Sequence, residues 1–186
     1  MQADMNSIPA AGADAIETLI ADHKRIKSLL SDLTAGSQSS SRMQTLEQLQ
    51  AILTVHNAIE ENLIYPALRE VAGKKSESLK LYNETAEADV LLFTLDSMLK
   101  EGREDEFGKT AEKLQAAILE HIEDEEEKAF PHLQKGAEPQ QTQLLNESVR
   151  QLRGSLRFDI GGGRVQSGFE SGEIGSEAPM EAIQET

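Results

Sequence analysis

HNAIEENLIYP, residues 56–66, is followed later in the chain by a similar stretch, HIEDEEEKAFP, residues 121–131. Each begins with a histidine, carries a glutamate four residues on (Glu60 and Glu125), and ends with an aromatic residue and a proline. Positions i and i+4 of an α-helix lie on one face, so each stretch places an imidazole beside a carboxylate. Two such pairs in one chain predict a site that holds a pair of metal ions.

Apolar residues recur at helical spacing on both sides of these stretches. Pro66 and Pro131 have no N–H to donate, so a bend is expected just beyond each glutamate. The pattern predicts an all-α fold, an up-down-up-down four-helix bundle within residues 12–136. The expected helices cover about residues 14–34, 46–71, 76–100 and 104–134, and residues 1–11 are expected to form a flexible leader.

The chain changes character after the predicted bundle. A weaker apolar pattern over residues 137–153 predicts a short fifth helix. From Gly154 onward glycine is frequent and the apolar periodicity is lost, so residues 154–186 are expected to be disordered.

Composition excludes several kinds of site. The formal net charge is −15 and the sequence pI is about 4.6, which argues against binding nucleic acid or an anionic membrane surface. The sequence has no cysteine, so iron–sulfur clusters and Cys-ligated zinc are excluded, and nitrogen and oxygen must hold any metal. It shows neither a secretory signal nor an apolar run of about 20 residues, and we expect a cytoplasmic protein.

Further candidate ligands come from the first and third expected helices. His23 falls in the apolar stripe of the first helix. Aligning the two halves of the chain matches Ile26 to Val90 and sets Glu87 opposite His23, with Val90 and Phe93 expected to be buried. Helix lengths place all these groups in one layer of the bundle. The predicted metal ligands are His23, His56, Glu60, Glu87, His121 and Glu125.

Each of these features has a simpler reading when taken alone. A single histidine in an apolar stripe is more often a core residue, and a single His–Glu pair on a helix is often a surface pair. Together they favour a metal pair, because several buried ionisable groups are costly without compensation. Glu61 or Glu126 could exchange roles with the preceding glutamate, and Asn83 and Glu84 are candidates for outer contacts. His132, near a helix end, is expected to be exposed.

These residues resemble the ligand pattern of the hemerythrin-like (HHE cation-binding) domain, over roughly residues 14–135. The resemblance implies a non-haem centre of two iron ions, oxo- or hydroxo-bridged. His23 and His56 would be terminal ligands of one iron and His121 of the other, with Glu60 and Glu125 bridging. The third helix departs from the pattern, since Glu87 stands where the family has a histidine. Oxygen-rich ligation would also accept manganese.

The resemblance leaves three functions open. With two His–Glu motifs, the ligand pattern is most similar to that of di-iron repair-of-iron-centres proteins. That similarity implies reaction with O2, peroxide or NO in oxidative or nitrosative stress, or a role in iron homeostasis. The alternative is an O2 or iron sensor, or an iron store, whose 154–186 segment contacts a protein partner. The third is a metal-free structural bundle.

Overall fold

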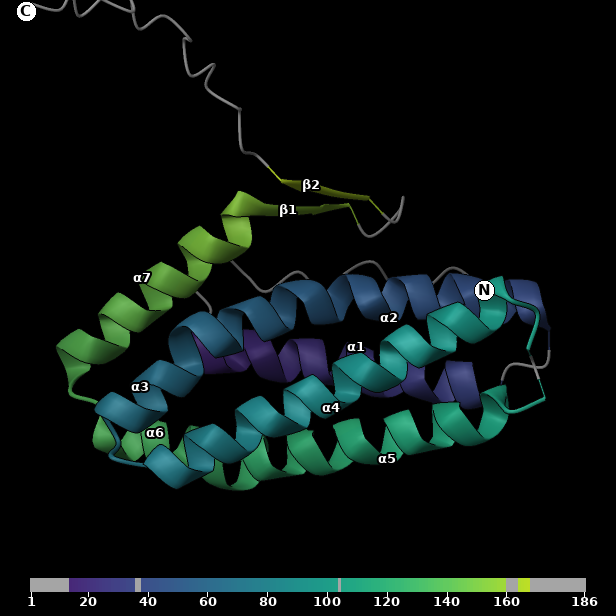
Figure 1. The fold of residues 1–186 in the computed structure, drawn as a ribbon. Helices are drawn as coiled ribbons and strands as arrows, with labels where there is room; N and C mark the ends of the chain where they lie inside the picture. Colours follow the sequence, from purple (N-terminus) through teal and green to yellow (C-terminus); the bar gives the residue numbers. More distant parts are fainter. Residues whose placement is uncertain (1–13, 36–37, 104, 160–163, 168–186) are drawn as a thin grey trace, which may run out of the picture.

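The computed structural model describes residues 14–35, 38–103, 105–159 and 164–167 (Figure 1). Its helices are α1 (Ala15–Ala35), α2 (Ser39–Ile59), α3 (Tyr65–Glu70), α4 (Lys75–Lys100), α5 (Phe107–Asp124), α6 (Phe130–Gly136) and α7 (Pro139–Ser155). Two π-helical segments, η1 (Glu60–Ile64) and η2 (Glu125–Ala129), join α2 to α3 and α5 to α6. Two short strands follow, β1 (Leu156–Asp159) and β2 (Arg164–Ser167).

The long helices α1, α2, α4 and α5 lie side by side and form a four-helix bundle (Figure 1). Asp14 begins α1, its side chain accepting a hydrogen bond from the Ile16 N–H at 2.8 Å. Gly73 has a φ of 69° in the turn before α4, a conformation that favours glycine. The predicted all-α bundle is confirmed.

The segment after the bundle is more ordered than its sequence indicates. α7 packs on the outside of the bundle and continues to Ser155 (Figure 1). β1 then pairs antiparallel with β2, Leu156 opposite Ser167, where no regular structure was expected. Apolar and polar residues alternate from Leu156 to Ile160, before the glycine triplet at 161–163, and this strand pattern was concealed by the loss of helical periodicity. The leader 1–11 and the rest of the predicted disordered tail lie outside the described residues.

The two π-helical segments rotate the helices that follow them. The N–H of Tyr65 donates to the carbonyl of Glu60, and that of Phe130 to the carbonyl of Glu125, five residues earlier in each case. Pro66 and Pro131 follow at once and begin regular α-helix. Because the wider turn takes up an extra residue, the glutamate and the aromatic side chain of each segment are both buried.

The core consists of two apolar clusters with a polar layer between them. One cluster uses residues such as Ile26, Leu49 and Leu114, and the other uses Leu19, Ile59 and Leu133. Burying each such side chain contributes about 1.5–3 kcal/mol to the stability of the fold. This gain offsets the unfavourable free energy of burying the polar layer. His23, His56, Glu60, His121 and Glu125 lie in this layer and are buried.

The face that α4 turns inward differs from the predicted one. Val90 and Phe93 are 65% and 71% exposed, whereas Leu81, Thr85 and Leu92 are buried. α4 carries apolar residues on more than one side, so its sequence does not identify the inner face. Contacts with α2, α3 and α5 select the face that fits between them.

In the described part of the chain, none of the helices has the length and apolar character needed to cross a membrane. The cytoplasmic location stays a prediction.

Candidate metal centre

The polar layer brings side chains from α1, α2, η1, α5 and η2 to one point. His23 Nε2 lies 3.2 Å from Glu125 Oε2 and 3.9 Å from Glu60 Oε1, and His56 Nε2 lies 2.8 Å from the same Glu60 oxygen. One ligand atom from each of these four residues lies within 4.8 Å of the others. Two ligand atoms at right angles, each about 2.1 Å from a metal ion, are about 3 Å apart, so the spacing suits a shared ion.

The second oxygens of the same two glutamates face the opposite side of the layer. The Tyr65 hydroxyl lies 3.1 Å from Glu60 Oε2, 3.0 Å from Glu125 Oε1 and 3.2 Å from His121 Nε2. A phenol has one proton and can donate to only one of the two carboxylates. Tyr65, His121 and the second glutamate oxygens therefore form another group of closely spaced nitrogen and oxygen atoms.

Unpartnered atoms support a cation on the first side. Among the described residues, the buried side-chain atoms without a hydrogen-bond partner are His23 Nε2, His56 Nδ1, Glu60 Oε1 and Glu125 Oε2. Three of these atoms point into the cluster. Buried polar atoms are nearly always paired, and a metal ion bound by the imidazole nitrogen and the two carboxylate oxygens would satisfy all three. The residues therefore fit a metal.

Each of the three histidines turns its Nδ1 atom outward to a carboxylate. The Nδ1 atom of His23 is 2.9 Å from Glu126 Oε1, and that of His121 is 3.1 Å from Glu84 Oε2. The Nδ1 atom of His56 is 3.7 Å from Asp22 Oδ2, beyond hydrogen-bond range. Carboxylates in these positions orient an imidazole so that its other nitrogen is free for a metal.

A cation in turn holds each outer carboxylate. Lys27 lies 3.2 Å from Glu126, Lys80 lies 2.9 Å from Glu84, and Arg153 binds both oxygens of Asp22. Asp124, within the second motif, pairs with Lys80 and Lys128.

The pKa values of the histidines and glutamates shift because these groups are buried and lie close to one another. Burial opposes the charged form of His56, but the charge of Glu60 and the nearby Asp22 outweigh it and raise the pKa of His56 to about 10. Burial also pushes the pKa of Glu60 upward, yet the charge of His56 and the polar contacts with the imidazoles of His23 and His56 bring it below its ordinary value. Burial and the charge of Glu60 raise the pKa of Glu125. A bound cation would displace the imidazole protons and remove the repulsion between the carboxylates.

The structure brings together five of the six residues predicted as ligands. Glu87 is the exception, since it is exposed on α4, and its predicted inward placement is wrong. The error has the same cause as for Val90 and Phe93, because all three residues lie on the exposed side of α4. At the layer, α4 instead presents Thr85, with Glu84 contacting His121.

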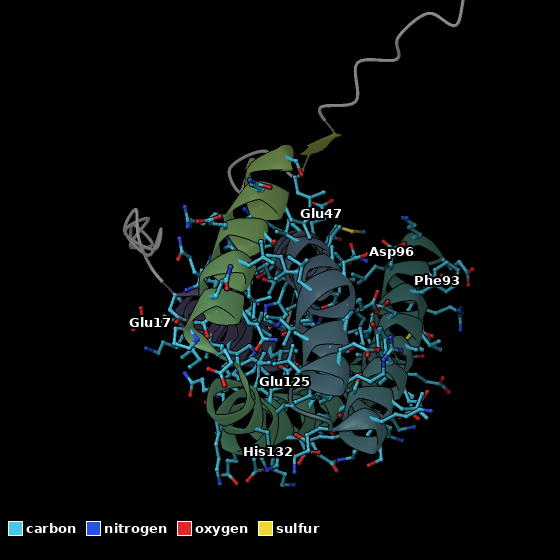
Figure 2. All side chains as sticks on the ribbon, turned by 90° about the vertical axis from the view of Figure 1, so that its left-hand side faces the viewer. Glu17, Glu47, Phe93, Asp96, Glu125 and His132 are labelled. Atoms are coloured by element: carbon cyan, nitrogen blue, oxygen red, sulfur yellow. The ribbon has the colours of Figure 1, made fainter. Side chains whose placement is uncertain are left out.

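The other candidates fall as follows. Glu126 is an outer partner of His23, whereas Glu61 is half-buried without contacting the cluster and Asn83 is exposed. His132 lies away from the centre, its Nδ1 atom 3.0 Å from Glu77 Oε2. The end-on view of Figure 2 places His132 and Phe93 at the edges of the molecule and Glu125 within it.

Tyr65 is the central residue that the sequence did not identify. Its aromatic–proline pair is visible in the sequence, but regular helical spacing puts Tyr65 about 180° from His56, at about 100° per residue. Only the π-helical turn brings its hydroxyl to the layer.

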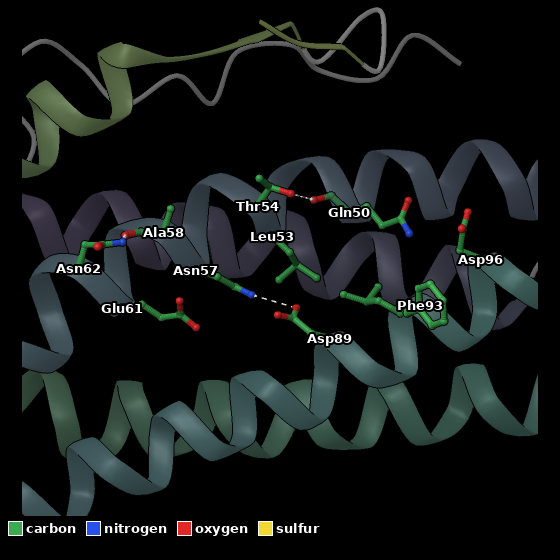
Figure 3. A pocket seen from close by; sticks show the side chains of 11 residues that line it. Gln50, Leu53, Thr54, Asn57, Ala58, Glu61, Asn62, Asp89, Phe93 and Asp96 are labelled. Atoms are coloured by element: carbon green, nitrogen blue, oxygen red, sulfur yellow. Dashed lines mark hydrogen bonds between the residues drawn. The ribbon is translucent and has the colours of Figure 1, made fainter. Parts of the chain in front are cut away.

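Two adjacent hollows lie beside the centre. A cavity of about 20 Å³ is bounded by His56, His121, Thr85 and apolar side chains. Leu53 and Asn57 separate it from an open pocket of about 510 Å³ between α2 and α4, since both residues line both spaces. In Figure 3 the Asn57 side chain reaches across this pocket to Asp89, with a hydrogen bond of 3.4 Å.

Comparison with known proteins gives a family and a fold. The family described as hemerythrin HHE cation binding domain matches residues 14–133. A crystal structure of a hemerythrin HHE cation binding domain-containing protein from Mycobacterium kansasii superposes with a TM-score of 0.63 and 22% identity. The match covers 78% of this chain and 90% of that one.

A curated relative is a protein named DNA nickase from Nostoc sp., which is 22% identical over 147 residues. The match covers 79% of this chain, and the chain spans only 41% of the length of that relative.

Proposed function

Since the chain belongs to the hemerythrin HHE cation binding domain family, we propose that its polar layer binds two metal ions and uses them on a small ligand. The observation that carries the proposal is the convergence of three imidazole Nε2 atoms on the two fully buried carboxylates of Glu60 and Glu125. Each of these imidazoles faces a carboxylate on its other side, as metal-bound histidines do.

The proposed ligands divide into two sets of four. His23, His56 and one oxygen of each glutamate would hold the first ion. His121, the Tyr65 oxygen and the second glutamate oxygens would hold the other. With Tyr65 as phenolate, Glu60, Glu125 and Tyr65 would give the protein ligands a charge of −3.

Iron is the proposed metal, with manganese as the competitor. Nitrogen and oxygen ligands suit both ions, and the chain has no thiolate to favour softer metals. When bound, such ions would supply redox chemistry that the side chains lack.

The hollows favour a very small reactant. A space of about 20 Å³ holds little more than one water molecule, the smallest cavity able to do so being about 10–15 Å³. O2, NO and hydrogen peroxide are of that order, whereas an organic substrate would be confined to the outer pocket. The apolar lining suits an uncharged molecule. We therefore propose that the protein reacts with peroxide, NO or O2 in oxidative or nitrosative stress or iron homeostasis.

The deciding experiment is metal quantitation on protein purified without chelators, followed by anaerobic titration of the reduced protein with peroxide, NO and O2. We expect about one metal per four-ligand set and rapid consumption of peroxide or tight NO binding. A stable O2 adduct that releases O2 under vacuum would instead support the sensor alternative. Metal-free protein that cannot be loaded would leave only the structural bundle.

A further inference from the structure

The helix α7 lies outside the segment that matches the family, which ends at residue 133, yet one of its side chains reaches the metal layer. Arg153 is in the last turn of α7 and holds Asp22 of α1 with two short contacts. Its Nη1 atom is 2.6 Å from Asp22 Oδ2 and its Nη2 atom is 2.7 Å from Asp22 Oδ1. Paired contacts of this kind fix the plane of a carboxylate as well as its position.

Asp22 stands between Arg153 and the centre. It is only 6% exposed, and its Oδ2 atom is the carboxylate oxygen that faces His56 Nδ1 at 3.7 Å. Among the described residues, His56 Nδ1 has no hydrogen-bond partner at shorter range. The gap leaves no room for a water molecule, so a shift of under about 1 Å would convert this contact into a hydrogen bond.

The other two histidines have their outer carboxylates held differently. Lys27 and Lys80 contact Glu126 and Glu84 through one nitrogen each, and both lysines come from helices of the bundle itself. Among these three histidines, and within the described residues, only His56 has an outer carboxylate that is held by a residue outside α1, α2, α4 and α5.

Contacts between α7 and the bundle fix the position of Arg153. Val149, one turn before it, is 1% exposed, and Asn146 accepts a hydrogen bond from the Ala15 N–H at 2.9 Å. α7 therefore contacts the beginning of α1 as well as Asp22.

We propose that Arg153 is a positioning residue of the metal centre, which orients the ligand His56 by clamping Asp22. The inference rests on the proposed function and extends the centre to a helix beyond the family segment. Outer partners of metal-bound histidines typically change metal affinity roughly ten- to a hundredfold. Because Arg153 acts through Asp22, we expect an effect near the lower end, roughly tenfold.

The test compares Arg153→Gln with Arg150→Gln, an equal charge change at an exposed position of the same helix. Co²⁺ is the probe, its affinity measured by competition with a chelator and its ligand-field absorption recorded. We expect Arg153→Gln to weaken binding roughly tenfold and alter the absorption. Arg150→Gln should do neither, and Arg153→Lys should recover part of the loss.

A double-mutant cycle separates positioning from simple helix packing. In an Asp22→Asn background, Arg153→Gln should cause no further loss, because the residue it acts through is already altered. An equal loss in both backgrounds would overturn the inference, as would wild-type affinity in Arg153→Gln. Failure of the unmodified protein to bind any metal would instead overturn the proposed function, and this inference with it.

Discussion

In both halves of the bundle a glutamate begins a π-helical segment, and an aromatic residue followed by proline begins the α-helix after it. The two aromatic side chains nevertheless do different things. Tyr65 places its hydroxyl among Glu60, Glu125 and His121. Phe130 stacks on the ring of His23, with the centroids 5.8 Å apart and the planes 10° from parallel. The same backbone arrangement therefore places a hydroxyl group on one side of the layer and an apolar ring on the other.

The first helices of the two halves differ in the same way. α1 contributes His23 to the layer, whereas α4 contributes Thr85, whose hydroxyl donates to the Leu81 carbonyl. Beside His121, the Tyr65 hydroxyl from α3 contacts both the Nε2 atom of His121 and the Thr85 hydroxyl of α4. The two halves therefore share their π-helical backbone turns but differ in the side chains that they place in the layer.

The largest expected loss of metal follows a change in a glutamate that belongs to both proposed ligand sets. Glu125→Ala should remove most of both metal ions, because its two oxygens face different ligand sets. The loss should exceed the roughly hundredfold upper range for outer partners. Metal content of the purified protein measures it, with exposed Glu127→Ala as the control. A Glu125→Ala protein with full metal content would refute a shared site.

Metal removal should lower stability as well. At a free metal concentration a thousand times Kd, binding to the folded state alone contributes about 4 kcal/mol. Urea unfolding with and without a chelator measures this difference. The gain should shrink in His56→Ala, and equal stability in both conditions would argue against metal binding by the folded chain.

The aromatic pair gives the next test. Tyr65→Phe removes one oxygen and should weaken the ion on the His121 side, abolishing any phenolate-to-iron charge-transfer absorption while the other ion stays. Phe130→Leu should leave both ions bound and cost about 1 kcal/mol of unfolding free energy. Metal content and visible spectra distinguish the two variants. If both behaved alike, the asymmetry between the halves would have no chemical meaning.

A smaller loss of metal affinity is expected for substitutions in α4. Glu84→Gln should weaken metal binding on the His121 side roughly tenfold, because it removes the charge that faces His121 Nδ1. Glu87→Gln should have no effect, since Glu87 is exposed. Metal titration of both variants decides the matter, and a loss of metal in Glu87→Gln alone would restore the original assignment.

No effect is expected on DNA. The net charge of −15 opposes binding to a polyanion, and the chain spans only 41% of the relative named DNA nickase. Supercoiled plasmid incubated with metal-loaded protein should stay intact, as it should with the Glu125→Ala protein. Nicking that requires Glu125 would contradict this expectation.

Most of the bundle could be predicted because helical periodicity is a local property. His56 and Glu60, and likewise His121 and Glu125, are one turn apart within a single helix, so their proximity needs no knowledge of the rest of the chain. The same reasoning failed for Glu87, since the inner face of α4 depends on which of its apolar residues the neighbouring helices accept.

By itself, the sequence determined the class of fold, the two His–Glu pairs and the absence of thiolate ligands, because spacing and residue type are sufficient for these. Tertiary structure alone placed Tyr65 and Arg153, and it selected Glu84 rather than Asn83 as the outer contact of His121. Tyr65 reaches the layer only through a π-helical turn that shifts the helical phase, and the other two meet their partners across helices distant in sequence. Such contacts depend on how the helices pack, and a local sequence pattern does not indicate how they pack.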